Sequence, residues 1–101
     1  MNYSYRLHPK ATEDIANAYA WYEEIQTGLG ERFIQTVKNK IENILSSPAL
    51  YGSKKKGFRE TIIGKDFPFL VVYKILDSEK EILISSIFHA KRNPKNKYRK
   101  I

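Results

Sequence analysis

The sequence has no cysteine, one tryptophan, one methionine and only five glycines and four prolines in 101 residues. Without cysteine, a disulfide framework and thiolate chemistry are excluded. A zinc site would have to use His8, His89 and carboxylates alone, so we expect no metal and no cofactor. The lack of cysteine fits a reducing cytoplasm. The N-terminus has no apolar leader segment, and the longest apolar run, residues 67–73, is too short to cross a bilayer, so we expect no membrane partner.

The residues that are present indicate one globular domain with an uneven charge. Apolar residues make up 42% of the chain, and its length fits a single domain spanning residues 1–101. Residues 1–53 carry five basic and six acidic side chains, whereas residues 54–101 carry thirteen basic and five acidic ones. This excess favours an acidic or polyanionic partner for the second half, and solubility alone is the other explanation.

Helical periodicity occurs twice in the first half of the chain. Pro9 fits the first turn of the first helix, where its missing N–H is no loss. His8, at the start of this helix, fits a cap or a surface residue. Two glycines in residues 27–30 permit the turn that ends this helix, and Pro48 ends the second helix. Because the connection is short, we expect an antiparallel helical hairpin. The two apolar stripes consist of Ala11, Ile15, Ala18, Tyr22 and Ile25, and of Leu29, Phe33, Val37, Ile41, Ile44 and Leu45.

The remaining segments predict β-strands. The order β-α-α-β-β-β indicates an α+β fold, in which an antiparallel sheet carries the N-terminal helical hairpin packed on one face. A turn at residues 77–80 joins the last two strands, which are apolar on both faces and therefore central. The predicted strands are residues 3–7, 57–63, 67–75 and 81–88.

Several of these segments occur together in a characteristic order. The first helix reads HPKATEDIANAYAWY, the second ends in SSPALYG, FR opens the next strand, and FPFLVVYKI and IFHAKRNP follow. The set resembles the RelE/ParE superfamily of toxins from bacterial type II toxin–antitoxin systems over about residues 3–98. Its most specific part is the H-x-x-R-x-P pattern of His89, Arg92 and Pro94. The long hairpin and the FP-x-L-V-x-Y strand favour the ParE branch.

The resemblance implies a small toxin that a cognate antitoxin holds inactive. ParE-like members bind and poison DNA gyrase, whereas RelE-like members cut messenger RNA on the ribosome without a metal ion. We favour gyrase poisoning, because the helical hairpin is ParE-like and the set of catalytic candidates is small. In addition, Ala90 follows His89 where one RNA-cleaving branch has a tyrosine. A ribosome-dependent endoribonuclease is the alternative, so enzymatic activity is left open. Trp21 lies off the apolar stripe, and exposed aromatic surface there would suit an antitoxin segment.

RNA cleavage without a metal needs an acid or base and cations that stabilise the charged phosphorane. His89 is the catalytic candidate for proton transfer, because histidine exchanges protons near neutral pH. Arg59 is the candidate for holding the phosphate with two hydrogen bonds. The residues expected to bind the target or nucleic acid are Lys54, Lys55, Lys56, Lys91, Arg92 and Tyr98.

Each candidate also has a purely structural explanation. His89 closes a strand, where its ring can satisfy a backbone group. Arg59 can form an ion pair with Glu60 or another surface acid. Lysines 54–56 fit an exposed loop whose charge serves solubility, and residues 95–101 fit a flexible basic tail that contains Tyr98.

Overall fold

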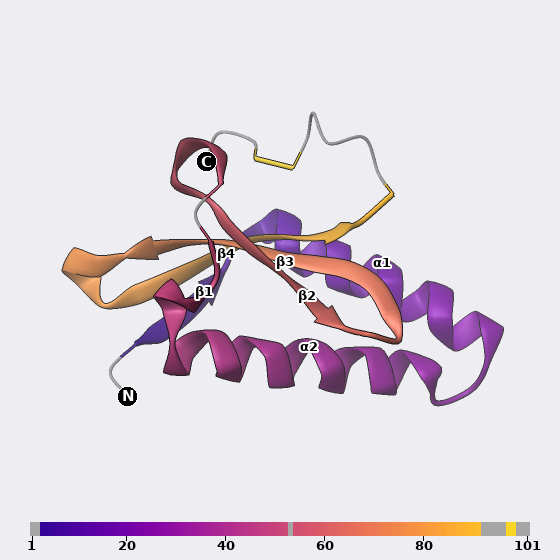
Figure 1. Cartoon of the computed structure of the whole chain (residues 1–101). Helices are drawn as coiled ribbons and strands as arrows, with labels where there is room; N and C mark the ends of the chain where they lie inside the picture. Colours follow the sequence, from indigo (N-terminus) through magenta and orange to yellow (C-terminus); the bar gives the residue numbers. More distant parts are fainter. Residues whose placement is uncertain (1–2, 53, 92–96, 99–101) are drawn as a thin grey trace.

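The computed structural model describes residues 3–52, 54–91 and 97–98 and shows two helices packed on a four-stranded sheet (Figure 1). This confirms the α+β class and the predicted order of elements. The helices and strands are β1 (Ser4–Leu7), α1 (Pro9–Ile25), α2 (Leu29–Ser46), β2 (Arg59–Gly64), β3 (Phe67–Leu76) and β4 (Glu81–His89). Short 3-10 turns at Pro48–Leu50, Lys55–Gly57 and Asp77–Glu79 connect them.

The sheet is mixed, because its first strand joins it in parallel. The spatial order is β1-β4-β3-β2, and β2, β3 and β4 form the predicted antiparallel meander. β1 pairs in parallel with residues 81–84, which corrects the expectation of an entirely antiparallel sheet. The helical hairpin returns the chain to the end of the sheet where β1 began (Figure 1). From there β2 runs in the same direction as β1. Because β3 is antiparallel to β2 and β4 is antiparallel to β3, β4 is parallel to β1.

The main core lies between the helices and one face of the sheet. Phe33 is fully buried, and its ring centroid lies 5.4 Å from that of Phe67 and 5.2 Å from that of Phe69. The predicted stripes face this core except at Ile25, which ends α1 and is 59% exposed. The buried hydrophobic side chains of the helices are Ala11 and Ala18 of α1 and Phe33, Val37, Ile41 and Ile44 of α2.

The two glycines between the helices have different physical roles. Gly28 has a φ of +93°, so it supplies the turn that the sequence predicted. Gly30 is helical, and it is required because the helices approach closely: an added Cβ would lie 2.8 Å from the Tyr19 carbonyl oxygen. The Glu23 carboxylate of α1 accepts hydrogen bonds from the N–H groups of Gly28 and Gly30, at 2.8 and 2.9 Å. This carboxylate therefore caps the N-terminus of α2.

Gly30→Ala is expected to lower the free energy of unfolding by about 1–3 kcal/mol, because the methyl group forces the helices apart. The loss should appear although alanine favours an isolated helix by about 1 kcal/mol. Urea denaturation followed by circular dichroism measures the change. Gly52→Ala is the matched control, because an added Cβ there meets nothing within 4 Å. Equal stability of the two variants would show that the close approach is not a constraint.

Candidate functional site

His89 ends β4 and lies opposite Phe69 of β3, with the ring centroids 5.0 Å apart. Its Nδ1 accepts a hydrogen bond from the backbone N–H of Lys91 at 3.1 Å. In the neutral ring, this bond leaves the proton on Nε2. The half-buried imidazole therefore presents an N–H group toward its surroundings.

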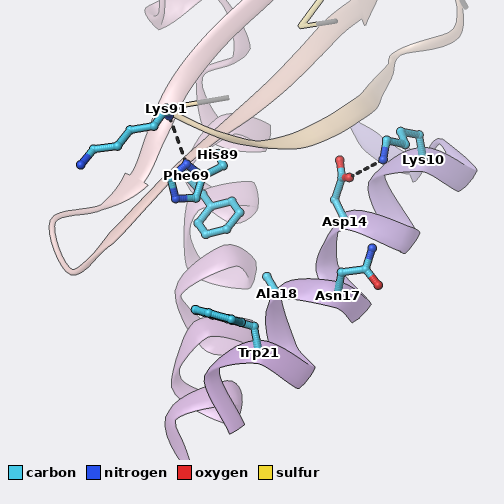
Figure 2. Close-up of a pocket in the computed structure, with 8 residues that line it drawn as sticks. All are labelled: Lys10, Asp14, Asn17, Ala18, Trp21, Phe69, His89 and Lys91. Carbon is cyan, nitrogen blue, oxygen red and sulfur yellow. Dashed lines mark hydrogen bonds and ion pairs between the residues drawn. The ribbon is translucent and has the colours of Figure 1, made fainter. Parts of the chain in front are cut away.

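His89 lines a cavity of about 540 Å³ between α1 and the ends of β3 and β4, which we call the α1 cavity (Figure 2). Residues spaced three or four apart on α1 face the strands, so a single helix face forms one wall. Trp21 is 63% exposed, which confirms the predicted exposure of this ring. The lining residues are Lys10, Asp14, Asn17, Ala18 and Trp21 from α1, together with Phe69, His89 and Lys91.

Asp14 is a buried carboxylate that connects α1 to the edge of β4. Its Oδ2 accepts a hydrogen bond from the Ile87 N–H at 3.0 Å, and its Oδ1 lies 3.0 Å from the Lys10 ammonium group. β1 pairs only as far as Ile84, so Asp14 supplies an acceptor beyond the end of that strand. The hydrogen bond from Lys10 to Asp14 raises the pKa of Lys10.

Sequence reasoning missed this role of Asp14. An acid in the first turns of a helix is typical of a solvated residue that interacts with the helix dipole. The available signal was its position between Ala11 and Ala18, on the buried stripe of α1.

Arg59 lies at another part of the sheet, opposite Tyr73 of β3. Its guanidinium group donates a hydrogen bond to the Tyr51 carbonyl. The Tyr73 hydroxyl donates to the Pro48 carbonyl at 2.6 Å. Burial raises the pKa of Tyr73 to about 12, and the positive charge of Arg59 opposes this shift. Arg59 and Tyr73 thus fasten the segment that follows α2 to the sheet.

The structure does not bring His89 and Arg59 together. Their partners on β3, Phe69 and Tyr73, are four residues apart, and β2 and β4 lie on opposite sides of β3. Strand geometry therefore separates their backbones by roughly 16 Å. At this backbone separation, with the Arg59 guanidinium group on the Tyr51 carbonyl and His89 at the α1 cavity, the two residues do not form one compact site, and their catalytic roles stay predictions.

The lysines of the basic loop, residues 54–56, are exposed in the turn that precedes β2. Lys56 has a φ of 60°, and the Lys54 N–H donates to the Phe58 carbonyl at 2.6 Å. Their exposure fits a binding loop and a solubilising loop equally. Lys91 is also exposed, just beyond β4. Arg92 and Pro94 lie outside the described residues.

Tyr98 packs on the open face, which we define as the sheet face turned away from the helices. Its ring stacks on that of Phe58, with centroids 5.4 Å apart and an interplanar angle of 23°. Its hydroxyl donates to the Glu60 carboxylate, which also lies 3.2 Å from the Lys97 ammonium group. Burial, followed by the hydrogen bond to Glu60, raises the pKa of Tyr98. Tyr98 therefore has a structural partner, and its predicted role in target binding stays untested.

The open face carries a second, smaller core around Phe58, Val72 and Phe88. This confirms that β3 and β4 are apolar on both faces. Lys74 places its ammonium group 4.6 Å from the Phe58 ring centroid, and Lys97 lies 5.9 Å from that of Phe88. These cations cover aromatic rings and contribute to packing on this face.

Comparison with known protein families shows to which family the chain belongs. Residues 5–94 match the family described as the ParE toxin of the type II toxin–antitoxin system parDE. The chain belongs to the ParE toxin family. A search of curated protein sequences finds no match.

Solved structures share the fold of this ParE-family chain at low sequence identity. The chromosomal ParDE system from P. aeruginosa is 20% identical, with a TM-score of 0.63, over 89% of this chain and 98% of that one. The E. coli RelBE toxin–antitoxin complex is 17% identical, with a TM-score of 0.66, over 89% and 99% of the respective chains. The YoeB–YefM complex from Staphylococcus aureus is 19% identical, with a TM-score of 0.55, over 87% and 97%.

These comparisons confirm the predicted RelE/ParE superfamily. None of the helices among the described residues is long and apolar enough to span a bilayer.

Proposed function

We propose that this ParE-family toxin binds and poisons DNA gyrase and that a cognate antitoxin neutralises it. Its family membership and the sequence resemblance to the ParE branch support this target. The observation that carries the proposal is the separation of the catalytic candidates. His89 faces the α1 cavity, whereas Arg59 donates to the Tyr51 carbonyl near the other end of β3. A binding mechanism requires no converging set of acid, base and phosphate-stabilising groups.

The charge distribution also suits a target that holds DNA. The basic loop exposes three consecutive lysines at residues 54–56, and Lys91 is exposed beyond β4. Exposed ammonium groups bind the phosphate backbone without reading its sequence. A complex of gyrase with DNA offers such phosphates beside the protein surface.

Controlled induction in bacteria tests the target in cells. We expect early induction of the DNA-damage response while incorporation of labelled amino acids continues. The ribonuclease alternative instead predicts an early collapse of translation with cleaved messages. Under that alternative, His89→Ala and Arg59→Ala each slow cleavage by about a hundredfold or more. Lys38→Ala, which changes an exposed residue of α2, is the control for substitution alone.

The antitoxin part of the proposal has its own test. The reading frame next to the gene is expected to encode a short, acidic and partly disordered protein. Its co-expression should abolish the toxicity of the full chain, and the two proteins should co-purify. Unchanged toxicity would remove the antitoxin from the proposal.

A further inference from the structure

The end of the sheet where β2 begins gathers lysines from three parts of the chain. The basic loop, residues 54–56, is exposed. Lys40 of α2 places its ammonium group 5.5 Å from the Tyr51 ring centroid, on the helix side of this loop. Lys74 of β3 places its ammonium group 4.6 Å from the Phe58 ring centroid, on the open face. We call these five lysines, at positions 40, 54, 55, 56 and 74, the basic end.

Backbone contacts hold the basic end in place. The Lys54 N–H donates to the Phe58 carbonyl at 2.6 Å, and the Phe58 N–H donates to the Lys55 carbonyl at 3.1 Å, so the loop is closed on itself. The Arg59 guanidinium group donates to the Tyr51 carbonyl and thereby ties the segment after α2 to the first residue of β2. The cations are therefore positioned before a partner binds, which reduces the entropy that binding costs.

Carboxylates leave the charge of the basic end uncompensated. No ion pair joins its five lysines to a carboxylate within residues 3–52, 54–91 and 97–98. The Glu60 carboxylate of β2 lies 3.2 Å from the Lys97 ammonium group and accepts a hydrogen bond from Tyr98. Glu42 follows Lys40 by two positions on α2, and helix residues at that spacing do not face each other. The basic end therefore attracts a polyanion.

The aromatic rings at the basic end are covered, which favours a duplex over single-stranded nucleic acid. Phe58 is 1% exposed and stacks against Tyr98, and the Lys40 ammonium group lies over the Tyr51 ring. Proteins that bind unpaired bases stack them on open aromatic rings. The basic end instead offers ammonium groups, which bind phosphates as point charges and do not read base edges.

We propose that the basic end is a binding site for the phosphate backbone of duplex DNA and that it binds without sequence preference. Lys40 and Lys74 contact phosphates on either side of those that the basic loop holds. The inference rests on the proposed function only for the source of the DNA, which is the segment that gyrase holds. Binding of the duplex itself requires no gyrase.

Fluorescence anisotropy of a labelled duplex of about 20 base pairs, titrated with the full-length toxin, measures this site directly. We expect binding at 50 mM salt and a loss of roughly a hundredfold in affinity at 200 mM salt, as about four phosphate contacts predict. Two duplexes of unrelated sequence should bind equally well.

Lys40→Ala and Lys74→Ala are each expected to weaken duplex binding about fivefold or more at low salt and to make its salt dependence less steep. Lys65→Ala is the matched control, because it removes the same charge from an exposed lysine roughly 20 Å away, past the other end of β2. Lys74→Arg keeps the charge and should bind as the unmodified chain does. Urea denaturation verifies that the variants are folded.

The outcomes separate this inference from the proposed function. If gyrase is poisoned but the free duplex does not bind, or if Lys40→Ala or Lys74→Ala binds it as tightly as Lys65→Ala, the DNA site is wrong and the gyrase proposal stands. If single-stranded RNA of the same length displaces the duplex at an equal or lower concentration, the assigned nucleic acid is wrong. If duplex binding depends on both lysines but gyrase activity is unchanged, the proposed target fails and the DNA site stands.

Discussion

Phe33→Ala is expected to lower the free energy of unfolding by about 3–5 kcal/mol. Phe33 is fully buried where α2 meets the sheet, and its ring contacts those of Tyr22, Phe67 and Phe69. Removing the ring loses its burial and leaves a cavity that these three neighbours cannot close by a small shift. A domain of this size has about 5–15 kcal/mol of stability, so the variant should be close to unfolding.

Thermal denaturation followed by circular dichroism measures this loss, at about 4–8 °C for each kcal/mol. Trp21→Ala is the matched control, because it also removes an aromatic ring from the helical hairpin but one that is 63% exposed. We expect the control to change stability by less than about 1 kcal/mol. Similar losses in both variants would mean that the aromatic cluster around Phe33 is not the centre of the core.

Asp14→Ala is expected to cost about 2–3 kcal/mol, because it leaves the Ile87 N–H without its acceptor at a buried strand edge. The substitution also removes the ion pair with Lys10. Urea denaturation at neutral pH measures the difference from the unmodified chain.

Asp14→Asn separates the hydrogen bond from the charge. Its amide oxygen still accepts from Ile87, so this variant should lose less stability than Asp14→Ala. The Asp14 bond raises the pKa of Lys10 above its ordinary value of 10.5. The stability that comes from this ion pair is therefore fully present below pH 10.5 and is lost as the pH rises through the shifted pKa. Equal losses of stability in the two variants would show that the charge of Asp14, and not its hydrogen bond with the Ile87 N–H, provides the stabilisation.

The period of the apolar residues predicted the helices and strands well, because each element buries one continuous face. Pro48 predicts where α2 ends. The apolar residues on both faces of β3 and β4 predict that these strands lie in the centre of the sheet. The parallel pairing of β1 was not predictable in this way, since four residues at a sheet edge carry no mark of strand direction. This parallel pairing depends on the path that the chain takes through the hairpin of α1 and α2.

The candidate site was less predictable, because its contacts join residues that are far apart in the sequence. Nothing local to Arg59 indicates that its guanidinium group meets the Tyr51 carbonyl, and nothing local to Tyr98 indicates its stacking on Phe58. Trp21 was the exception, since its position off the apolar stripe predicted its exposure. Asp14 lies on the apolar stripe of α1 with Ala11 and Ala18. Its hydrogen bond with the Ile87 N–H was recognised only from its burial in the structure.

Supercoiling of relaxed plasmid by purified DNA gyrase, with and without the full-length toxin, tests the proposed target most directly. Gyrase poisoning predicts that micromolar toxin inhibits supercoiling and that covalent gyrase–DNA cleavage complexes accumulate. Addition of the antitoxin beforehand should restore the activity. Normal supercoiling without trapped DNA breaks, using folded toxin that stops bacterial growth, would contradict gyrase as the target.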